Sequence, residues 1–270
     1  MAKVLVVTSG KGGVGKTTST AAIGAALAQN GKKVAVVDFD VGLRNLDLVL
    51  GAERRVVFDL INVVQGIAKL PQALIRDKRL ENLWLLPASQ TRDKDALTEE
   101  GVGRIIADMR SNFDYILCDS PAGIERGAML AMRFADEAII VTNPEVSSVR
   151  DSDRIIGMLD SKTVKAEKGE QVAKHILLTR YDPSRAARGE MLAIEDILEI
   201  LATPLLGIIP ESQDVLRASN VGSPVTLNSP ASAPAKAYSD ATKRLLGETI
   251  AMLVPSEPKG LMKLFGRRAA

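Results

Sequence analysis

Residues 10–17, Gly-Lys-Gly-Gly-Val-Gly-Lys-Thr, constrain the fold more than any other part of this 270-residue chain. They match the phosphate-binding pattern G-x-x-x-x-G-K-[ST] in full. A short apolar run, Val4–Thr8, precedes them, and an alanine-rich helical pattern, Thr17–Gln29, follows. A loop between a strand and a helix can present backbone N–H groups and the positive end of the helix dipole to a phosphate. We therefore expect a nucleotide-binding α/β domain.

The rest of the chain alternates short apolar runs with helical patterns. The runs are apolar throughout, which is typical of parallel strands that are buried on both faces. This order predicts one doubly wound α/β domain, with a mainly parallel sheet and helices on both faces. The further strands are expected at Val34–Asp38, Leu83–Leu86, Tyr115–Asp119, Ala138–Thr142, Ile176–Thr179 and Leu205–Ile209. The further helices are expected at Val102–Met109, Ser148–Leu159, Glu190–Ile200 and Ala233–Leu246, with a charged loop at Ser161–Lys174.

Composition excludes several other classes of protein. Hydrophobic residues make up 46% of the chain and charged residues 25%, so wholesale disorder is excluded. One cysteine cannot form a disulfide within the chain or an all-cysteine metal site, and one histidine argues against acyl-transfer chemistry. No apolar run approaches the roughly 18 residues of a membrane-spanning helix, and the N-terminus has no secretory signal pattern.

Positive charge is concentrated at the C-terminus. The net charge is +2, and the last twelve residues hold four basic residues and no acid, which leaves −2 for the rest. Two prolines in residues 254–258 predict a linker between a nucleotide-binding domain over residues 1–253 and a tail over residues 259–270.

The sequence of residues 259–270 predicts a short amphipathic helix. On a helical wheel its large apolar residues share one face and most of its cations lie opposite, a pattern typical of a helix lying on an anionic membrane surface. A packed terminal helix or a disordered basic tail is the alternative. The apolar residues are Leu261, Met262, Leu264 and Phe265, and the opposing cations are Lys259, Lys263 and Arg267.

The phosphate-binding loop predicts how ATP and Mg²⁺ would be held. Lys16 is expected to reach the β- and γ-phosphates, and the hydroxyl of Thr17 to bind Mg²⁺. A glycine-rich turn without a ligand is the alternative. The residues expected around the nucleotide phosphates are Gly10, Lys11, Gly12, Gly13, Val14, Gly15, Lys16, Thr17 and Thr18.

Carboxylates follow two of the predicted strands. Ligands in such sheets bind beyond the carboxyl ends of the strands, so Asp38, Asp40 and Asp119 are expected near the phosphates. Asp38 or Asp40 could position the attacking water, and the other could support Mg²⁺ or Lys11. Asp119 is expected to hold Mg²⁺, through water. Two surface acids at the end of a strand are the alternative for the first pair.

The second lysine of the loop, Lys11, resembles the signature of the deviant Walker A ATPases, which include the MinD and ParA families. A lysine buried against a partner needs a pairing charge, and a triphosphate supplies it, so dimerisation would depend on ATP. The chain also resembles the MinD family of bacterial division-site ATPases over almost its whole length, with gaps at 160–175 and near 226–258. The blocks that carry this resemblance are 42–47, 53–57, 88–97, 119–125, 142–154 and 216–220.

The resemblance implies a slow ATPase that forms a homodimer with ATP. Lys11 of each subunit would complete the other subunit's site, and Asp40 would orient the attacking water, with Lys16 as the third catalytic residue. Residues that flank the adenine in similar ATPases correspond to Arg180, Pro210 and Glu211. Ordinary loop residues are the alternative for these three.

The resemblance also implies partners and a location. A MinC-like septum inhibitor would be recruited, a MinE-like activator would stimulate hydrolysis, and residues 259–270 would bind the anionic inner membrane. The protein would be cytoplasmic, and peripheral on the cytoplasmic face of the inner membrane in its ATP state. The final residues, Arg-Arg-Ala-Ala, differ from the C-terminus that is usual in that family.

Two other classes share the loop. A ParA-like DNA-partitioning ATPase would need a basic surface, and the near-neutral body weighs against it, so no specific nucleic acid is expected. An iron-protein reductase normally bridges its dimer with two cysteines per chain, which Cys118 alone cannot supply.

The helix after Pro144 is the candidate surface for protein partners, with a solvated helix face as the alternative. Its exposed charged residues are expected to be Glu145, Arg150, Asp151, Asp153 and Arg154.

Overall fold

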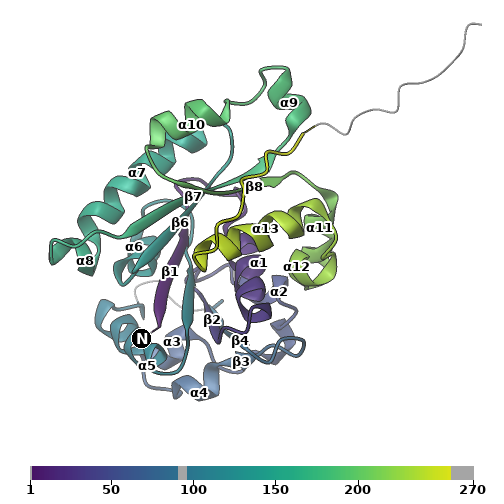
Figure 1. Ribbon diagram of the computed structural model, residues 1–270. Coiled ribbons are helices and arrows are strands. Elements are labelled where there is room, and N and C mark those ends of the chain that lie inside the picture. The colour runs from purple at the N-terminus through teal and green to yellow at the C-terminus, as the bar shows by residue number, and fades with distance from the viewer. Residues whose placement is uncertain (1, 91–95, 257–270) are drawn as a thin grey trace, which may run out of the picture.

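The computed structural model describes residues 2–90 and 96–256. They form one eight-stranded sheet with helices on both faces, as the sequence predicts (Figure 1). The order is β3-β4-β2-β5-β1-β6-β7-β8, and all neighbouring strands are parallel except β3 and β4. The strands are β1 (Lys3–Thr8), β2 (Val34–Asp38), β3 (Ile75–Arg76), β4 (Leu83–Leu86), β5 (Tyr115–Asp119), β6 (Glu137–Thr142), β7 (Ala173–Tyr181) and β8 (Leu205–Pro210).

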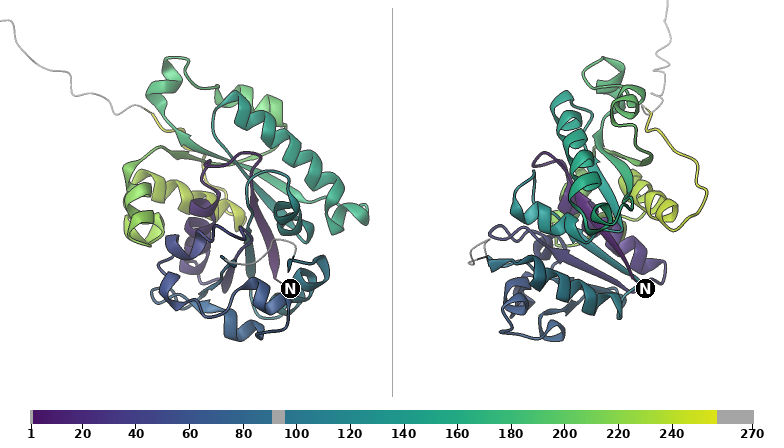
Figure 2. Two further views of the ribbon diagram at one scale, coloured as in Figure 1. Left: turned by 180° about the vertical axis from the view of Figure 1, so that it is seen from behind. Right: turned by 90° about the vertical axis from the view of Figure 1, so that its left-hand side faces the viewer.

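The helices divide between the two faces of the sheet (Figure 2). One face is covered by α1 (Lys16–Gln29), α2 (Leu46–Val49), α11 (Gln213–Asn220), α12 (Val225–Asn228) and α13 (Ala233–Leu245). The other face is covered by α3 (Leu60–Val64), α4 (Leu70–Ala73), α5 (Glu99–Arg110), α6 (Arg126–Arg133), α7 (Val146–Lys162) and α10 (Ile194–Leu201). Three short elements complete the set: the 3-10 helix η1 (Glu53–Arg55), α8 (Val164–Glu167) and α9 (Pro183–Ala187).

Successive residues of each central strand supply two separate cores. Val4 and Val6 of β1 pack in the core beneath α5, α6 and α7, whereas Leu5 and Val7 pack beneath α1 and α13. Side chains of a strand alternate between faces, so a strand covered on both sides must be apolar at every position. This explains the unbroken apolar runs in the sequence. Cys118 of β5 is one of these core residues, with 1% of its surface exposed.

Helix α1 is buried on almost every side because it lies between the sheet and α13 (Figure 1). Small residues allow this close packing, and Gly24 is the tightest point: a Cβ atom there would lie 2.8 Å from Cγ1 of Val36 in β2. On the other side of α1, the hydroxyl of Ser19 lies 3.0 Å from the phenol oxygen of Tyr238 in α13. The helix that follows the phosphate-binding loop is thus held from both sides.

The structure corrects several predicted boundaries. Residues 161–174 are not simply a loop, because α7 extends to Lys162 and α8 follows after Thr163, whose hydroxyl accepts a hydrogen bond from the N–H of Ala166. The helix expected from residue 190 begins at Ile194. The sequence did not predict several short elements. A helix of at most eight residues makes about two turns or fewer, too few to show a helical period, and β3 has only two residues. The elements missed are η1, β3, α2, α3, α4, α6, α9, α11 and α12.

The chain after α13 runs back along the sheet without regular structure. The guanidinium of Arg244 fastens it by donating to the carbonyls of Leu206, Ile250 and Ala251. Val254–Ser256 of the predicted linker are described and form no helix or strand, whereas the predicted tail at 259–270 lies outside the described residues. Within residues 2–90 and 96–256, no helix is both long enough and apolar enough to cross a membrane.

The close contact at Gly24 predicts a stability difference between two glycine-to-alanine variants. Gly24→Ala should lower the free energy of unfolding by about 1–2 kcal/mol, because overpacking costs ~1–3 kcal/mol and better helix propensity returns up to ~1 kcal/mol. Gly157→Ala in α7 is the matched control, because nothing lies within 4 Å of its added Cβ. It should raise stability by roughly 0.5–1 kcal/mol. Urea unfolding measures both, and equal changes would contradict the packing argument.

Candidate nucleotide-binding site

The phosphate-binding loop lies where β1 ends and α1 begins, at the carboxyl edge of the parallel strands. Gly13 and Gly15 have φ angles of 75° and 98°, in the left-handed region that glycine adopts without strain. This backbone geometry turns successive N–H groups to one side, as phosphate binding requires. The loop residues predicted from the sequence are therefore brought together in the conformation that their glycines allow.

Lys16 begins α1, and its side chain folds back over the loop. It is 8% exposed, and its ammonium donates to the hydroxyl of Ser9 at 2.9 Å and to the carbonyl of Lys11 at 3.4 Å. Burial lowers the pKa of Lys16, while the charges of Asp119 and Asp40 oppose that effect. A buried cation with two neutral partners beside a ring of backbone N–H groups is well placed to meet an anion.

Asp119 ends β5 directly beside α1. Its carboxylate accepts hydrogen bonds from the hydroxyls of Thr17 and Thr20, the latter at 2.9 Å. Burial raises the pKa of Asp119 to about 6, although these hydrogen bonds and Lys16 oppose the rise. A threonine hydroxyl and a carboxylate together form an all-oxygen donor set, which suits Mg²⁺. The residues that were predicted for the metal therefore fit it.

Asp38 lies next to Asp119, because the parallel register pairs the last residues of β2 and β5. Burial, then the neighbouring charge of Asp119, raise the pKa of Asp38 well above its usual value. Its two carboxylate oxygens accept the backbone N–H groups of Asp40 at 2.8 Å and Leu46 at 3.2 Å. Asp38 thus fixes the loop that carries Asp40, which is half-buried at the same edge.

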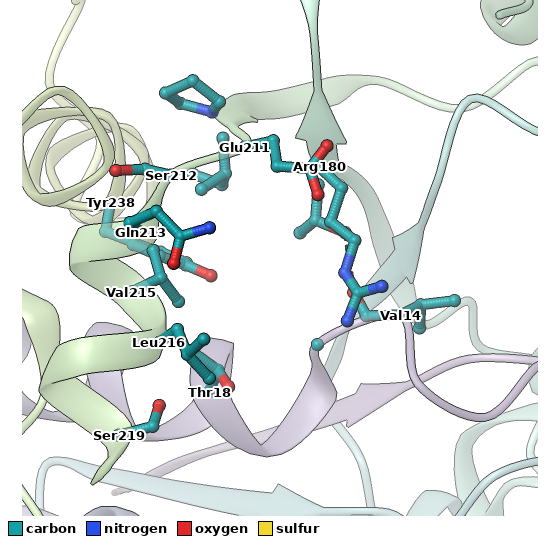
Figure 3. Close-up of a pocket in the computed structure, with 14 residues that line it drawn as sticks. Val14, Thr18, Arg180, Glu211, Ser212, Gln213, Val215, Leu216, Ser219 and Tyr238 are labelled. Carbon is teal, nitrogen blue, oxygen red and sulfur yellow. Dashed lines mark hydrogen bonds between the residues drawn. The ribbon is translucent and has the colours of Figure 1, made fainter.

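A cavity of about 300 Å³ opens beside the loop, between the ends of β7 and β8 and helix α11. The three residues predicted to flank a base, Arg180, Pro210 and Glu211, all line it together with Val14, Gly15 and Thr18 of the loop and α1. Figure 3 shows Arg180 on one side and Val215 and Leu216 of α11 on the other. A cavity with apolar and polar lining residues beside a phosphate-binding loop is a candidate site for the nucleoside part of a nucleotide.

The opposite wall of this cavity was missed from the sequence. It comes from the loop and first turns of α11 and from α13 beneath, and neither helix has a motif that marks a ligand. The block at residues 216–220 was noted only for its family resemblance. The missed residues are Ser212, Gln213, Val215, Leu216, Ser219 and Tyr238.

The side chain of Lys11 contacts the beginning of α7. Its ammonium donates to the Glu145 carboxylate at 2.9 Å and to the Ser147 hydroxyl at 3.1 Å, where α7 begins. Gly10 touches the same helix, because a Cβ atom on it would lie 2.4 Å from atoms of Asp151. The predicted partner helix therefore packs directly against the start of the phosphate-binding loop. Of its predicted surface residues, Glu145, Arg150, Asp153 and Arg154 are exposed and Asp151 is half-buried.

Comparison with known proteins shows the family to which this domain belongs. Residues 5–225 match the family model of the CobQ/CobB/MinD/ParA nucleotide binding domain. The fold and the loop thus define a P-loop nucleotide-binding protein of the MinD/ParA class.

More similar relatives narrow the class. The septum site-determining protein MinD of Escherichia coli K12 is 63% identical over 270 residues, which cover 98% of this chain and 100% of that protein. MinD in a MinC:MinD complex from Aquifex aeolicus is 44% identical, with a TM-score of 0.84 over 94% of this chain and 99% of that one. MinD from Pyrococcus horikoshii, complexed with Mg-ADP, is 33% identical, with a TM-score of 0.80 over 91% and 96%. The chain belongs to the MinD family of septum site-determining proteins.

Proposed function

We propose that this protein hydrolyses ATP to ADP and phosphate with Mg²⁺, and that the nucleotide state controls dimerisation and membrane attachment at the division site. The observation that carries the proposal is the joint position of three groups at one edge of the sheet. These are the buried ammonium of Lys16, the Thr17–Asp119 hydrogen bond, and the cavity that adjoins them. The Mg-ADP bound to the Pyrococcus relative supports the same choice of ligand.

In the proposed reaction, Lys16 exchanges its hydrogen bond to Ser9 for phosphate oxygens, and the loop N–H groups hold the same phosphates. Thr17 and Asp119 would hold Mg²⁺, which would supply positive charge beside the phosphates. Asp40 orients the attacking water in line with the bond to be broken. The carboxylate of Asp38 keeps Asp40 in place by accepting the backbone N–H of Asp40. Phosphoryl transfer depends mainly on positioning and charge stabilisation, so no strong base is required.

Dimerisation is proposed to bring Lys11 to the partner's nucleotide. Lys11 lies at the surface, with its side chain 40% exposed, and its Glu145 partner is 49% exposed. An ion pair at that exposure contributes little, about 0–1 kcal/mol, so a triphosphate can compete for the lysine. ATP would therefore stabilise the dimer by supplying the charge that Lys11 needs at the interface.

The proposed partners follow from the family. The MinC:MinD complex from Aquifex aeolicus supports recruitment of a MinC-like septum inhibitor. A MinE-like activator would stimulate hydrolysis and release the protein from the membrane. The protein would be cytoplasmic in its free state and peripheral on the inner membrane in its ATP state. It would attach to the membrane through the tail at residues 259–270, which the linker at 254–258 separates from the ATPase domain at 1–253.

Asp40→Ala tests the hydrolytic step. The variant should bind ATP with near-normal affinity, because Lys16 and the loop remain, but its turnover should fall at least tenfold. Lys16→Gln is the matched control that should lose ATP binding itself, because the phosphates lose their main cation. Phosphate release and binding of a fluorescent ATP analogue are measured together. Normal hydrolysis by Asp40→Ala would assign the water-positioning role elsewhere, with Asp38 as the next residue to test.

Lys11→Ala tests whether Lys11 is needed for dimerisation but not for ATP binding. The variant should retain ATP affinity within about tenfold but should elute as a monomer in size-exclusion chromatography with Mg·ATP. Lys78→Ala, at an exposed lysine in the turn before β4, removes the same charge and should dimerise normally. An ATP-dependent dimer of Lys11→Ala would contradict a role for this lysine across the interface.

Deletion of residues 259–270 tests the membrane proposal. Each tail alone should bind weakly because ordering a twelve-residue helix offsets much of its apolar burial. A dimer presents two tails, which raises avidity by ~10²–10⁴. The truncated chain should dimerise with ATP but should not sediment with anionic liposomes. Phe265→Glu should act like the deletion and Phe265→Leu like the unaltered chain. ATP-dependent sedimentation of the truncated chain would refute attachment through the tail.

A further inference from the structure

Thr179 lies near the end of β7, where the strand is irregular. The register with β8 shifts between Leu178 and Tyr181, and Arg180 has a φ angle of 53°, in the left-handed region that disfavours side chains. Thr179 lies within this irregular segment and is 4% exposed. Its side chain faces the phosphate-binding loop, and it lines the nucleoside cavity beside Val14 and Gly15. In the sequence, Thr179 is the last residue of an expected strand, directly before Arg180, and had no role of its own.

The hydroxyl of Thr179 contacts three oxygens. The carbonyl of Val14 is nearest at 2.7 Å, followed by the side-chain oxygen of Asn143 at 2.9 Å and the carbonyl of Thr142 at 3.3 Å. A hydroxyl has one proton to donate. The shortest contact assigns that proton to Val14, whereas an amide such as that of Asn143 can also present its N–H₂ to the hydroxyl oxygen. Thr179 is therefore a link between the loop and β6.

The Val14 carbonyl determines the direction of a neighbouring donor. Carbonyl and N–H of one trans peptide unit point in opposite directions, and the described residues contain no cis peptide. With its carbonyl held by Thr179, the Val14–Gly15 unit points the N–H of Gly15 away from β7. Gly15 has no Cβ to hinder rotation of this unit, so the local backbone alone permits either orientation. The hydrogen bond from Thr179 selects one of them.

We propose that Thr179 is a positioning residue for nucleotide binding, which acts through Val14 to aim the N–H of Gly15 at the phosphates. The inference rests on the proposed function of the loop as an ATP site. The residues that contact Thr179 are themselves held in place. Thr142 ends the buried strand β6 and Asn143 follows it. The hydroxyl of Ser148 in α7 lies 3.0 Å from that of Thr142 and accepts the N–H of Asn143 at 3.2 Å. Loss of the Thr179 hydroxyl should weaken phosphate binding without altering the catalytic carboxylates.

Three variants of the full-length protein test this inference. Thr179→Val keeps the shape and removes the donor, whereas Thr179→Ser keeps the donor. Thr203→Val is the matched control, because Thr203 is also buried and also donates to a backbone carbonyl, that of Leu201, before β8 at the opposite edge of the sheet. The measurements are the Kd of fluorescently labelled Mg·ADP, the KM and kcat for Mg·ATP, and thermal unfolding.

We expect Thr179→Val to raise the Kd for Mg·ADP and the KM for Mg·ATP by roughly tenfold, the effect of losing one buried hydrogen bond, with kcat within about twofold. Thr179→Ser and Thr203→Val should stay within about twofold of the unaltered chain in every constant. If Thr179→Val unfolds, Thr179→Ala, which leaves room for water, should show the same weakened Kd.

Several outcomes would overturn the inference. One is an unchanged Kd in Thr179→Val, another is an equal loss in Thr203→Val, and a third is an equal loss in Thr179→Ser. Failure of the proposed function is distinguishable from these results. An unaltered chain that binds Mg·ADP but does not hydrolyse Mg·ATP would refute the ATPase proposal alone, and the Kd comparison would still decide the role of Thr179. An unaltered chain that binds no nucleotide would refute both.

Discussion

The hydrogen bonds between Asp119 and the first turns of α1 join the two halves of the candidate site. Thr17 and Thr20 present hydroxyls from the helix, and the carboxylate receives them at the end of β5. Because β5 lies between β1 and β2, this contact fixes the loop relative to both carboxylate-bearing strands. The pairing of Asp38 with Asp119 across the sheet then places Asp40 at the same edge. A metal, a phosphate loop and a water-positioning acid can therefore share one small region.

Helix α7 contacts the phosphate-binding loop at this edge of the sheet and also has residues exposed at the molecular surface. Lys11 and Gly10 contact the beginning of this helix, and Ser148 within it supports the polar residues at the end of β6. A protein that binds the exposed charges of α7 would contact a helix that directly abuts the loop. The exposed charges of α7 and its contacts with Lys11 and Gly10 thus lie along the same first turns of the helix.

The phosphate-binding loop and the acids at the strand ends could be predicted from the sequence, because each is encoded by residues that are close together in the chain. Lys16, Thr17 and Asp119 are local in this sense, and the apolar runs predicted all the longer strands. The wall of the cavity formed by Leu216 and Ser219 could not be predicted, since it depends on how α11 packs against α2 and α12. The link from Thr179 to Val14 joins residues 165 positions apart, and no local pattern encodes such a contact. The proposed roles of Lys11 and of residues 259–270 involve a second subunit and a membrane, so one chain alone cannot test them.

The burial of Cys118 has a practical meaning for the study of this protein. The thiol lies within β5 between two covered faces, and burial raises its pKa to about 12. Reactive cysteines are thiolates that reach solvent, so alkylating reagents and oxygen should leave this one untouched in the folded state. A cysteine introduced at the surface would therefore be the only thiol that a labelling reagent reaches in the folded protein. Because Cys118 is buried, a disulfide between two chains through this thiol is not expected to produce a dimer in the absence of nucleotide.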